Sequence, residues 1–253
     1  MKKSQIAAQC YTLRDFMNTP GGVDRSFAKL RKIGFEAVQI SGVGADPKDI
    51  KKYADLNGIT ICATHEGGND LLKKTDAIIE KLDFYNCSHT AYPYPSEWLF
   101  IDYESTLDFA RELDEVAVKF AAAGKTLSYH NHNIEFRKFA GQRILDIILE
   151  NAPHVQAEID TYWVQLGGCD PAGYVQKYAG REVIFHLKDC GVLHFDKTIM
   201  VPIGSGNLDW ATILPTAESA GVQWFIIEQD TCHKDPFDSL QDSFNYLTGN
   251  FVK

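Results

Sequence analysis

The chain has 253 residues, of which 45% are hydrophobic and 23% charged, which is typical of a globular protein with a sizeable core. Its formal net charge of −9 argues against a nucleic-acid partner, because such binding needs a basic face. No stretch reaches the roughly 18 apolar residues of a membrane span, and the start, MKKSQIAAQCYTL, lacks the apolar run of a signal peptide. The six scattered cysteines form no CxxC motif and favour buried thiols in a reducing compartment. We therefore expect a cytoplasmic protein with neither a nucleic-acid nor a membrane partner.

One pattern repeats along the chain. An amphipathic helix ends at a glycine, a short apolar strand follows, and the strand ends in a polar residue, as in Phe120–His132 and Ala217–Asp230. The expected strands are Gln5–Cys10, Glu36–Ile40, Ile59–His65, Asn86–Ala91, Thr126–His132, Val155–Asp160, Val183–Leu187 and Trp224–Glu228. The expected helices are Val23–Ile33, Pro47–Asn57, Asn69–Leu82, Tyr103–Ala123, Gln142–Glu150, Pro171–Tyr178, Asp209–Ser219 and Pro236–Thr248. Prolines mark three helix starts, and Asn69 and Asp209 are expected N-caps.

Eight such units in about 250 residues predict an α/β protein with a (β/α)8 barrel. The strands are apolar on both faces, as parallel strands covered by helices should be. A doubly wound open sheet is the alternative, but it favours a glycine-rich loop after the first strand, and QCYTLRDF has none. No low-complexity linker interrupts residues 1–253, so we expect one domain. The longest irregular stretch, Cys190–Leu208, is expected to be a short excursion with a turn at Gly204–Gly206.

Four of the strands end in potential metal ligands. These strands are TLSYHNH, VQAEID, VIFHLKD and WFIIEQD, and they follow one another at intervals of about 30 residues, the length of a strand-plus-helix unit. If the strands are parallel neighbours, their ends lie on one side of the sheet, where functional residues of such barrels gather. The candidate ligands are His130 or His132, Asp160, His186 and Glu228. Oxygen donors together with imidazole predict a site for a divalent cation.

Individual residues leave alternatives open. A lone strand histidine such as His186 is more often a hydrogen-bonded core residue than a ligand. Lys188 has the same parity as His186 and therefore points the same way, either to bind a substrate oxygen or a phosphate or to lie exposed at the strand end. Glu158 shares the parity of Asp160 and is expected to lie lower in the barrel as its partner.

Further residues are expected around the same rim. Glu135 lies past the end of the fifth strand and can fold back over the site, while His65 ends the third strand. Tyr92 and Tyr94 are expected to shape the pocket near the fourth strand, and Trp163 to wall it or to stack on a sugar face. No GxSxG, GxxxxGK[ST], GxGxxG or HExxH motif offers another chemistry.

The motifs GFEAVQIS, YHNHNIEF, EIDTYWV, HLKD, IGSGNLDW and IIEQD resemble the sugar phosphate isomerase/epimerase family, whose members are xylose isomerase-like TIM barrels. The resemblance covers nearly the whole chain. It implies a divalent metal, Mn²⁺ before Mg²⁺, Co²⁺ or Zn²⁺, held by Asp160, His186 and Glu228. Well-known branches have a glutamate at the end of the fifth strand, where this chain has His130, so either His130 binds the metal or Glu135 replaces the missing acid, and His130 is favoured. This departure counts against a symmetric two-glutamate epimerase mechanism.

The resemblance and the residues together predict a metal-dependent isomerase or epimerase of a keto-sugar or related polyol, which removes a proton beside a carbonyl through an enediolate. The alternatives are a lyase of the inosose or 3-keto-glycoside dehydratase type and, less favoured, an AP-endonuclease-like hydrolase or a non-catalytic binding barrel. Trp163 stands where the endonuclease branch has an additional histidine ligand. A small sugar or polyol is the expected partner, and a homo-oligomer is compatible with the composition. The expected catalytic residues are Glu228, Glu135, His132 and Lys188, and the expected substrate-binding residues are His65, Tyr92, Trp163 and Lys188.

Overall fold

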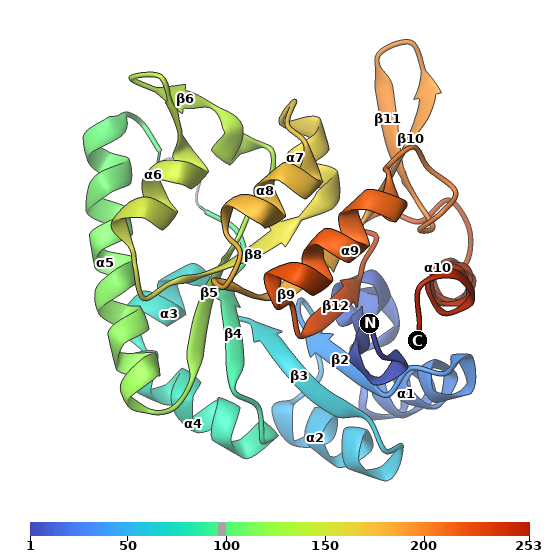
Figure 1. Ribbon diagram of the computed structural model, residues 1–253. Helices are drawn as coiled ribbons and strands as arrows, with labels where there is room; N and C mark the ends of the chain where they lie inside the picture. Colours follow the sequence, from blue (N-terminus) through green and yellow to red (C-terminus); the bar gives the residue numbers. More distant parts are fainter. Residues whose placement is uncertain (96–99) are drawn as a thin grey trace.

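Eight parallel strands close into a barrel in the computed structural model, which describes residues 1–95 and 100–253 (Figure 1). In their order around the barrel the strands are β1 (Ile6–Gln9), β2 (Ala37–Ile40), β3 (Thr60–His65), β4 (His89–Tyr92), β5 (Thr126–His130), β8 (Gln156–Asp160), β9 (Glu182–Leu187) and β12 (Trp224–Ile227). The last strand pairs in parallel with the first, with Ala7 opposite Ile226. The closed sheet confirms the predicted (β/α)8 barrel and excludes the open-sheet alternative.

The helices surround this barrel (Figure 1). They are α1 (Pro20–Ile33), α2 (Pro47–Leu56), α3 (Gly68–Lys73), α4 (Thr75–Tyr85), α5 (Tyr103–Ala122), α6 (Ile144–Asn151), α7 (Thr161–Leu166), α8 (Pro171–Lys177), α9 (Trp210–Ala220) and α10 (Pro236–Asn250). Prolines occupy the first position of α2, α8 and α10, as predicted. None of these helices has both the length and the apolar character needed to cross a membrane.

The predicted helices differ from the observed ones in two places. The helix expected over Asn69–Leu82 is two helices, because Lys74 leaves the helical conformation at φ −131° and ψ 37°. Asn69 therefore lies inside α3 and is not an N-cap, whereas Asp209 caps α9 by accepting a hydrogen bond from the Thr212 backbone N–H. The short helix α7 was not predicted, because its single run of six residues is too short to show a helical period.

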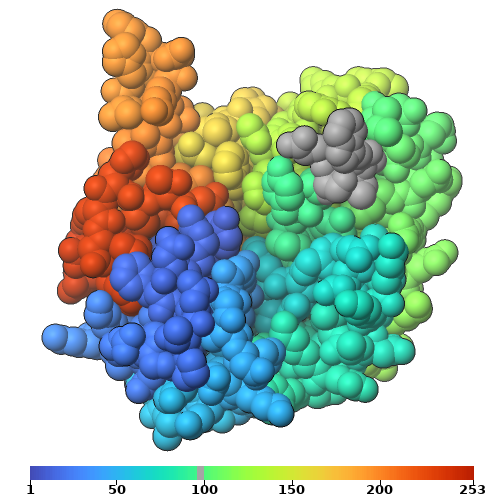
Figure 2. Space-filling view, turned by 180° about the vertical axis from the view of Figure 1, so that it is seen from behind, coloured from blue at the N-terminus to red at the C-terminus, as the bar shows by residue number. Residues whose placement is uncertain are grey.

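The excursion predicted after the seventh strand contains a β-hairpin. Strands β10 (Asp189–His194) and β11 (Lys197–Val201) pair antiparallel and project well beyond the rest of the molecule (Figures 1 and 2). The side chain of Asp189 organises the base of this excursion. Its carboxylate accepts hydrogen bonds from the backbone N–H groups of Cys190, Gly204, Gly206 and Leu208 and from Trp210 Nε1. A smaller hairpin, β6 (Lys138–Phe139) with β7 (Gln142–Arg143), and the 3₁₀ helices η1 (Lys3–Gln5), η2 (Cys10–Phe16) and η3 (Ile134–Phe136) complete the elements.

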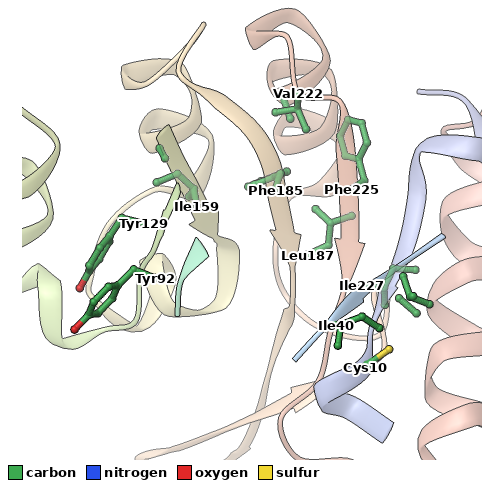
Figure 3. Packing of buried hydrophobic residues seen from close by; sticks show 14 of the residues in the cluster. Cys10, Ile40, Tyr92, Tyr129, Ile159, Phe185, Leu187, Val222, Phe225 and Ile227 are labelled. Carbon is green, nitrogen blue, oxygen red and sulfur yellow. The ribbon is translucent and has the colours of Figure 1, made fainter. Parts of the chain in front are cut away.

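Two clusters of the hydrophobic core follow from the alternation of side chains along each strand. Residues such as Phe185, Phe225 and Ile227 belong to the large core between strands and helices (Figure 3). The alternate residues Ala7, Ile184 and Ile226 form a separate small cluster, the floor inside the barrel. Nearer the carboxyl ends of the strands, the side chains that point into the barrel are polar. This change from apolar to polar positions the candidate site.

Candidate functional site

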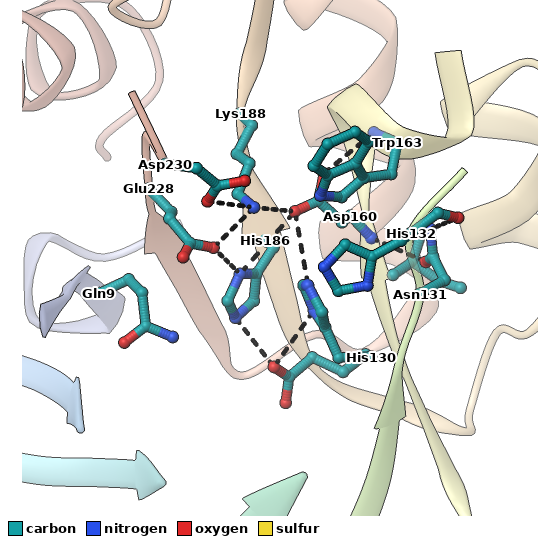
Figure 4. Close-up of polar contacts among 12 residues, drawn as sticks. Gln9, His130, Asn131, His132, Asp160, Trp163, His186, Lys188, Glu228 and Asp230 are labelled. Carbon is teal, nitrogen blue, oxygen red and sulfur yellow. Dashed lines mark hydrogen bonds and ion pairs between the residues drawn. The ribbon is translucent and has the colours of Figure 1, made fainter. Parts of the chain in front are cut away.

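The four predicted ligand positions converge at the carboxyl ends of the strands. One imidazole or carboxylate atom from each side chain lies within 4.8 Å of those of the other three, and all four residues are buried. They are His130 from β5, Asp160 from β8, His186 from β9 and Glu228 just after β12 (Figure 4). The barrel brings them together because these strands are consecutive neighbours in the sheet.

The group of four fits a divalent cation in its donor chemistry. Two imidazoles and two carboxylates are a donor set that Mn²⁺, Zn²⁺ and Co²⁺ accept. Burial raises the pKa of Asp160 to about 6, and within the described residues its Oδ2 accepts no hydrogen bond, although Lys188 Nζ lies 3.1 Å away. His186 Nδ1 lies 2.8 Å from Glu228 Oε2. A cation in their midst would compensate the buried carboxylates.

Lys188 is buried among three carboxylates and is not the exposed strand-end lysine of the alternative interpretation. Its Nζ lies 3.1 Å from Asp160, 3.0 Å from Glu228 and 2.9 Å from Asp230. Burial opposes the charge, but the carboxylates, with Asp160 first, outweigh it and raise the pKa of Lys188 well above its usual value. Burial would raise the pKa of Glu228, but Lys188 and His186 outweigh burial and hold this pKa well below its usual value. The lysine therefore carries a fixed positive charge at the site.

A further carboxylate, that of Glu158, lies beneath the group of four. Glu158 Oε1 is 2.6 Å from His65 Nε2, 2.8 Å from His186 Nε2 and 3.1 Å from Gln39 Nε2. Burial would raise the pKa of Glu158, but His65 and His186 outweigh burial and hold it at about 2. The side chain is thus an anion. It points into the barrel beneath the imidazoles, as the parity of the strand predicted.

A cavity of about 450 Å³ opens above these groups. His65, His130, Lys188, Glu228 and Asp230 form its polar floor, and its wall includes aromatic side chains. The His132 ring meets Tyr94 edge-on at 5.0 Å between centroids and lies 5.2 Å from Trp163. Burial lowers the pKa of His132 to about 3, so its imidazole is neutral at physiological pH. A polar floor and an aromatic wall suit a small molecule with several hydroxyl groups.

The profile of a protein family described as xylose isomerase-like TIM barrel matches residues 27–248. The chain belongs to this family. No curated protein matches it in sequence. A solved structure that this xylose isomerase-like barrel resembles is a sugar phosphate isomerase/epimerase from Parabacteroides distasonis, with TM-score 0.82, 21% identity and coverage of 100% of this chain and 96% of that chain.

Two further structures show the chemical range among similar folds. A 3-keto-D-glucoside 4-epimerase from E. coli has TM-score 0.68 and 18% identity, covering 97% of this chain and 99% of that chain. A probable 3-DHS dehydratase from Bacillus anthracis has TM-score 0.75 and 12% identity, covering 99% of this chain and all of that chain. At these identities the likeness shows the fold that the xylose isomerase-like barrel shares with an epimerase and with a dehydratase.

Two residues predicted at the site of this xylose isomerase-like barrel lie elsewhere. The carboxylate of Glu135 is buried and accepts hydrogen bonds from Tyr129 Oη and the His132 backbone N–H, both at 2.8 Å, outside the group of four. Tyr92 is buried in the core, stacked on Tyr129 at 5.8 Å between ring centroids (Figure 3), whereas Tyr94 lines the cavity. The structure thus brings His130, and not Glu135, to the fourth position.

Buried amides that were not predicted also lie at the site. Gln39 Oε1 lies 2.6 Å from His186 Nε2, and Gln9 Nε2 donates a hydrogen bond to the same Oε1 at 3.0 Å. Asn131 Oδ1 accepts a hydrogen bond from the Asp160 backbone N–H at 3.0 Å. Gln9 is the last residue of the strand IAAQ, and Gln39 is the last but one of the strand AVQI. A polar residue near the end of an apolar strand, the signal that indicated the candidate ligands, could therefore have indicated these two as well.

Proposed function

We propose that the chain is a metal-dependent isomerase or epimerase of a keto-sugar or related polyol, which acts by reversible removal of a proton beside a carbonyl. The observation that carries this proposal is the convergence of two imidazoles, two carboxylates and a buried lysine at the floor of one cavity. Of the divalent ions, Mn²⁺ is proposed first, as the resemblance to the sugar phosphate isomerase/epimerase family implies. Mg²⁺, Co²⁺ and Zn²⁺ are the alternatives.

His130, Asp160, His186 and Glu228 would hold the ion. Once bound, it supplies Lewis-acid polarisation of a substrate carbonyl. Lys188 presents a fixed positive charge toward an oxygen that becomes negative when the neighbouring carbon loses its proton. Glu228 lines the cavity as an anion and is the proposed proton acceptor.

The wall residues would orient the substrate. Trp163 offers a ring face to the C–H groups of a sugar, and its Nε1–H has no hydrogen-bond partner in the described part of the chain. The neutral His132 lines the cavity, where its ring can exchange a hydrogen bond with a hydroxyl group. His65 is proposed to reach the substrate from the cavity floor.

One observation favours a dehydratase as the second candidate. Asp230 lines the cavity 2.9 Å from Lys188 Nζ, and burial, with Glu228, raises the pKa of its carboxyl group despite the opposing lysine. A carboxyl group with a raised pKa can carry a proton to a departing hydroxyl group. Loss of that hydroxyl after the shared first step would make the enzyme a lyase.

Exchange of substrate C–H hydrogens with D₂O tests the common first step. Mn²⁺-loaded protein is incubated with keto-sugars, inososes and 3-keto-glycosides, and NMR identifies the carbon that exchanges. Glu228→Gln is expected to slow exchange by about 10²–10⁴-fold, the usual contribution of a positioned base, with an unchanged circular dichroism spectrum. Near-normal exchange in this variant would exclude Glu228 as the proton acceptor.

Asp230→Asn is the matched control, because it removes the other carboxylate that contacts Lys188 and lines the cavity but is not in the group of four. For an isomerase this variant is expected to keep both exchange and product formation within about tenfold. For a dehydratase it is expected to keep exchange and to lose elimination of water. Absence of metal binding and of exchange with every substrate would instead favour a non-catalytic barrel.

The domain organisation and the cellular compartment of the chain are part of the same proposal. We propose that residues 1–253 act as one domain, since the barrel closes by pairing its first strand with its last. All six cysteines are free and four of them are buried, which fits the reducing environment of the cytoplasm.

A further inference from the structure

Glu158 lies directly beneath the proposed metal ligands and touches imidazoles from three strands. It precedes Asp160 by two residues on β8, so both side chains point into the barrel. Its side chain is fully buried. Its Oε1 lies 2.6 Å from His65 Nε2, 2.8 Å from His186 Nε2 and 3.6 Å from His130 Nδ1. A lone buried carboxylate would be costly, and these imidazoles compensate it.

The two imidazoles in the group of four each lie between Glu158 and the carboxylates above. His186 directs Nε2 to Glu158, while its Nδ1 lies 2.8 Å from Glu228 and 4.0 Å from Asp160. His130 has the opposite ring orientation, with Nδ1 toward Glu158 and Nε2 3.8 Å from Asp160. In both rings, therefore, one nitrogen faces Glu158 and the other faces the proposed metal position.

We propose that Glu158 is a positioning residue that sets the ring orientation and the tautomer of His186, one of the two imidazole ligands, and thereby the metal affinity of the site. The proposal rests on the metal site of the proposed function. His186 Nε2 meets two acceptors, Glu158 Oε1 at 2.8 Å and Gln39 Oε1 at 2.6 Å, while Nδ1 meets Glu228 Oε2 at 2.8 Å, so without an ion both nitrogens carry a hydrogen. An ion held by the group of four would replace the hydrogen on Nδ1, and Glu158 and Gln39 would keep the one on Nε2. Outer carboxylates that hold a ligating histidine in this way raise its basicity as a ligand.

His65 belongs to the same arrangement as a partner of Glu158. It makes the shortest of the three imidazole contacts, and its ring is stacked on that of His186 at 5.3 Å with an interplanar angle of 10°. It therefore holds the Glu158 carboxylate against the other rings from the side of β3. Gln39 Nε2 adds a hydrogen bond to the same carboxylate oxygen at 3.1 Å.

A different role for Glu158 is that of a ligand in its own right. His65, His130, Glu158 and His186 also offer atoms within 4.8 Å of one another. However, Glu158 Oε1 lies only 2.6 and 2.8 Å from two imidazole nitrogens, which are hydrogen-bond distances. Ligand atoms about 2.0–2.1 Å from a tetrahedral ion would lie roughly 3.3 Å apart. The contacts therefore favour the positioning role, and a second bound ion is an outcome that the experiment can detect.

The test measures metal binding by the full chain after removal of metals with a chelator. Mn²⁺ and Co²⁺ are titrated calorimetrically, and the absorption spectrum of the Co²⁺ protein reports the geometry of the ligands. Glu158→Gln is expected to weaken metal binding by about 10–100-fold, to keep a stoichiometry of one, and to alter the Co²⁺ spectrum. Its turnover is expected to recover in part at saturating metal, which a general loss of structure would not allow.

Glu182→Gln is the matched control. Glu182 is also buried, on the neighbouring strand β9, and its Oε1 accepts a hydrogen bond from the Ile159 backbone N–H at 3.2 Å, so its oxygens contact no imidazole among the described residues. This variant is expected to bind metal within about twofold of the unaltered protein. If Glu158→Gln fails to fold, Gln39→Met removes the other acceptor from His186 Nε2 and is expected to weaken binding several-fold.

Three results would overturn the proposal. Wild-type affinity in a folded Glu158→Gln variant, or in Gln39→Met where that variant replaces it, would show that the rings do not depend on these acceptors. Two ions bound by the unaltered protein and one by Glu158→Gln would make Glu158 a ligand. If the unaltered protein binds no metal, the proposed function fails as well. If the unaltered protein and its variants all bind metal tightly and turn over substrate, only the positioning role of Glu158 is overturned.

Discussion

Replacing Glu135 with glutamine should remove a loss of stability that the protein suffers as the pH rises from 4.5 to about 7. The carboxyl group is fully buried, and burial raises its pKa from the usual 4.5 to about 7 although Tyr129 Oη and the His132 backbone N–H donate hydrogen bonds to it. Glutamine has nearly the same shape and keeps an oxygen to accept one of these bonds and an amide to donate to the Tyr129 hydroxyl. Unlike glutamate, glutamine cannot lose a proton and become charged.

The sign follows from the raised pKa of the folded state. Below about pH 4.5 both states hold the proton, so the residue does not affect the free energy of unfolding. Between pH 4.5 and about 7 the unfolded chain loses a proton that the folded chain keeps, and stability falls as the pH rises. At about 1.36 kcal/mol per pH unit, the penalty reaches about 3 kcal/mol and stays constant above that window. Glu135→Gln removes it.

Urea unfolding at pH 5 and pH 8 measures this effect. The stability of the variant relative to the unaltered protein should increase by about 2–3 kcal/mol between these pH values. The exposed Glu36→Gln is the control and should show no such change. An equal difference at both pH values would refute the raised pKa. Turnover of the folded variant separately tests Glu135 as a proton acceptor, since a structural role leaves catalysis largely intact.

Two further predictions concern the excursion after β9 and the substrate. Asp189→Asn should destabilise the protein by about 3–5 kcal/mol, because the new amide faces several of the N–H groups that now donate hydrogen bonds to the carboxylate. Thermal melting, combined with proteolysis at the β10–β11 hairpin, measures this effect. Unchanged melting would contradict the expectation. An unphosphorylated keto-sugar should have a higher kcat/KM than its phosphate ester, because Lys188, the only lysine or arginine among the described residues of the cavity lining, already contacts three carboxylates. Deuterium exchange of a matched pair of substrates measures the ratio, and preference for the ester would contradict the expectation.

The barrel and the convergence of the four candidate ligands could be predicted because they depend on local rules. Strand parity and the polar residue at each strand end determine where His130, Asp160, His186 and Glu228 point, and the order of parallel strands brings them together. These rules require only neighbouring residues in the sequence. The fold class followed from the same repetition of helix and strand.

Positions in loops could not be predicted in this way. The path of Glu135 depends on Tyr129, whose side chain points to the opposite face of β5 from His130, so the acid follows it into the outer layer. Tyr92 pairs in register with Tyr129 and shares that outer face. The base of the β10–β11 hairpin depends on the contacts of Asp189 with residues up to 21 positions later, which no local pattern reveals.

The pairing of β1 with β12 has a consequence for synthesis of the protein on the ribosome. Until the last strand emerges, β1 has a partner only in β2 and presents a free edge, which can pair with other chains. The proposed ligands lie on β5, β8 and β9 and after β12, so Glu228 is the last of them to be translated. Metal would therefore be bound completely only by chains that have closed the ring, and loading with the ion would distinguish finished molecules from nascent ones.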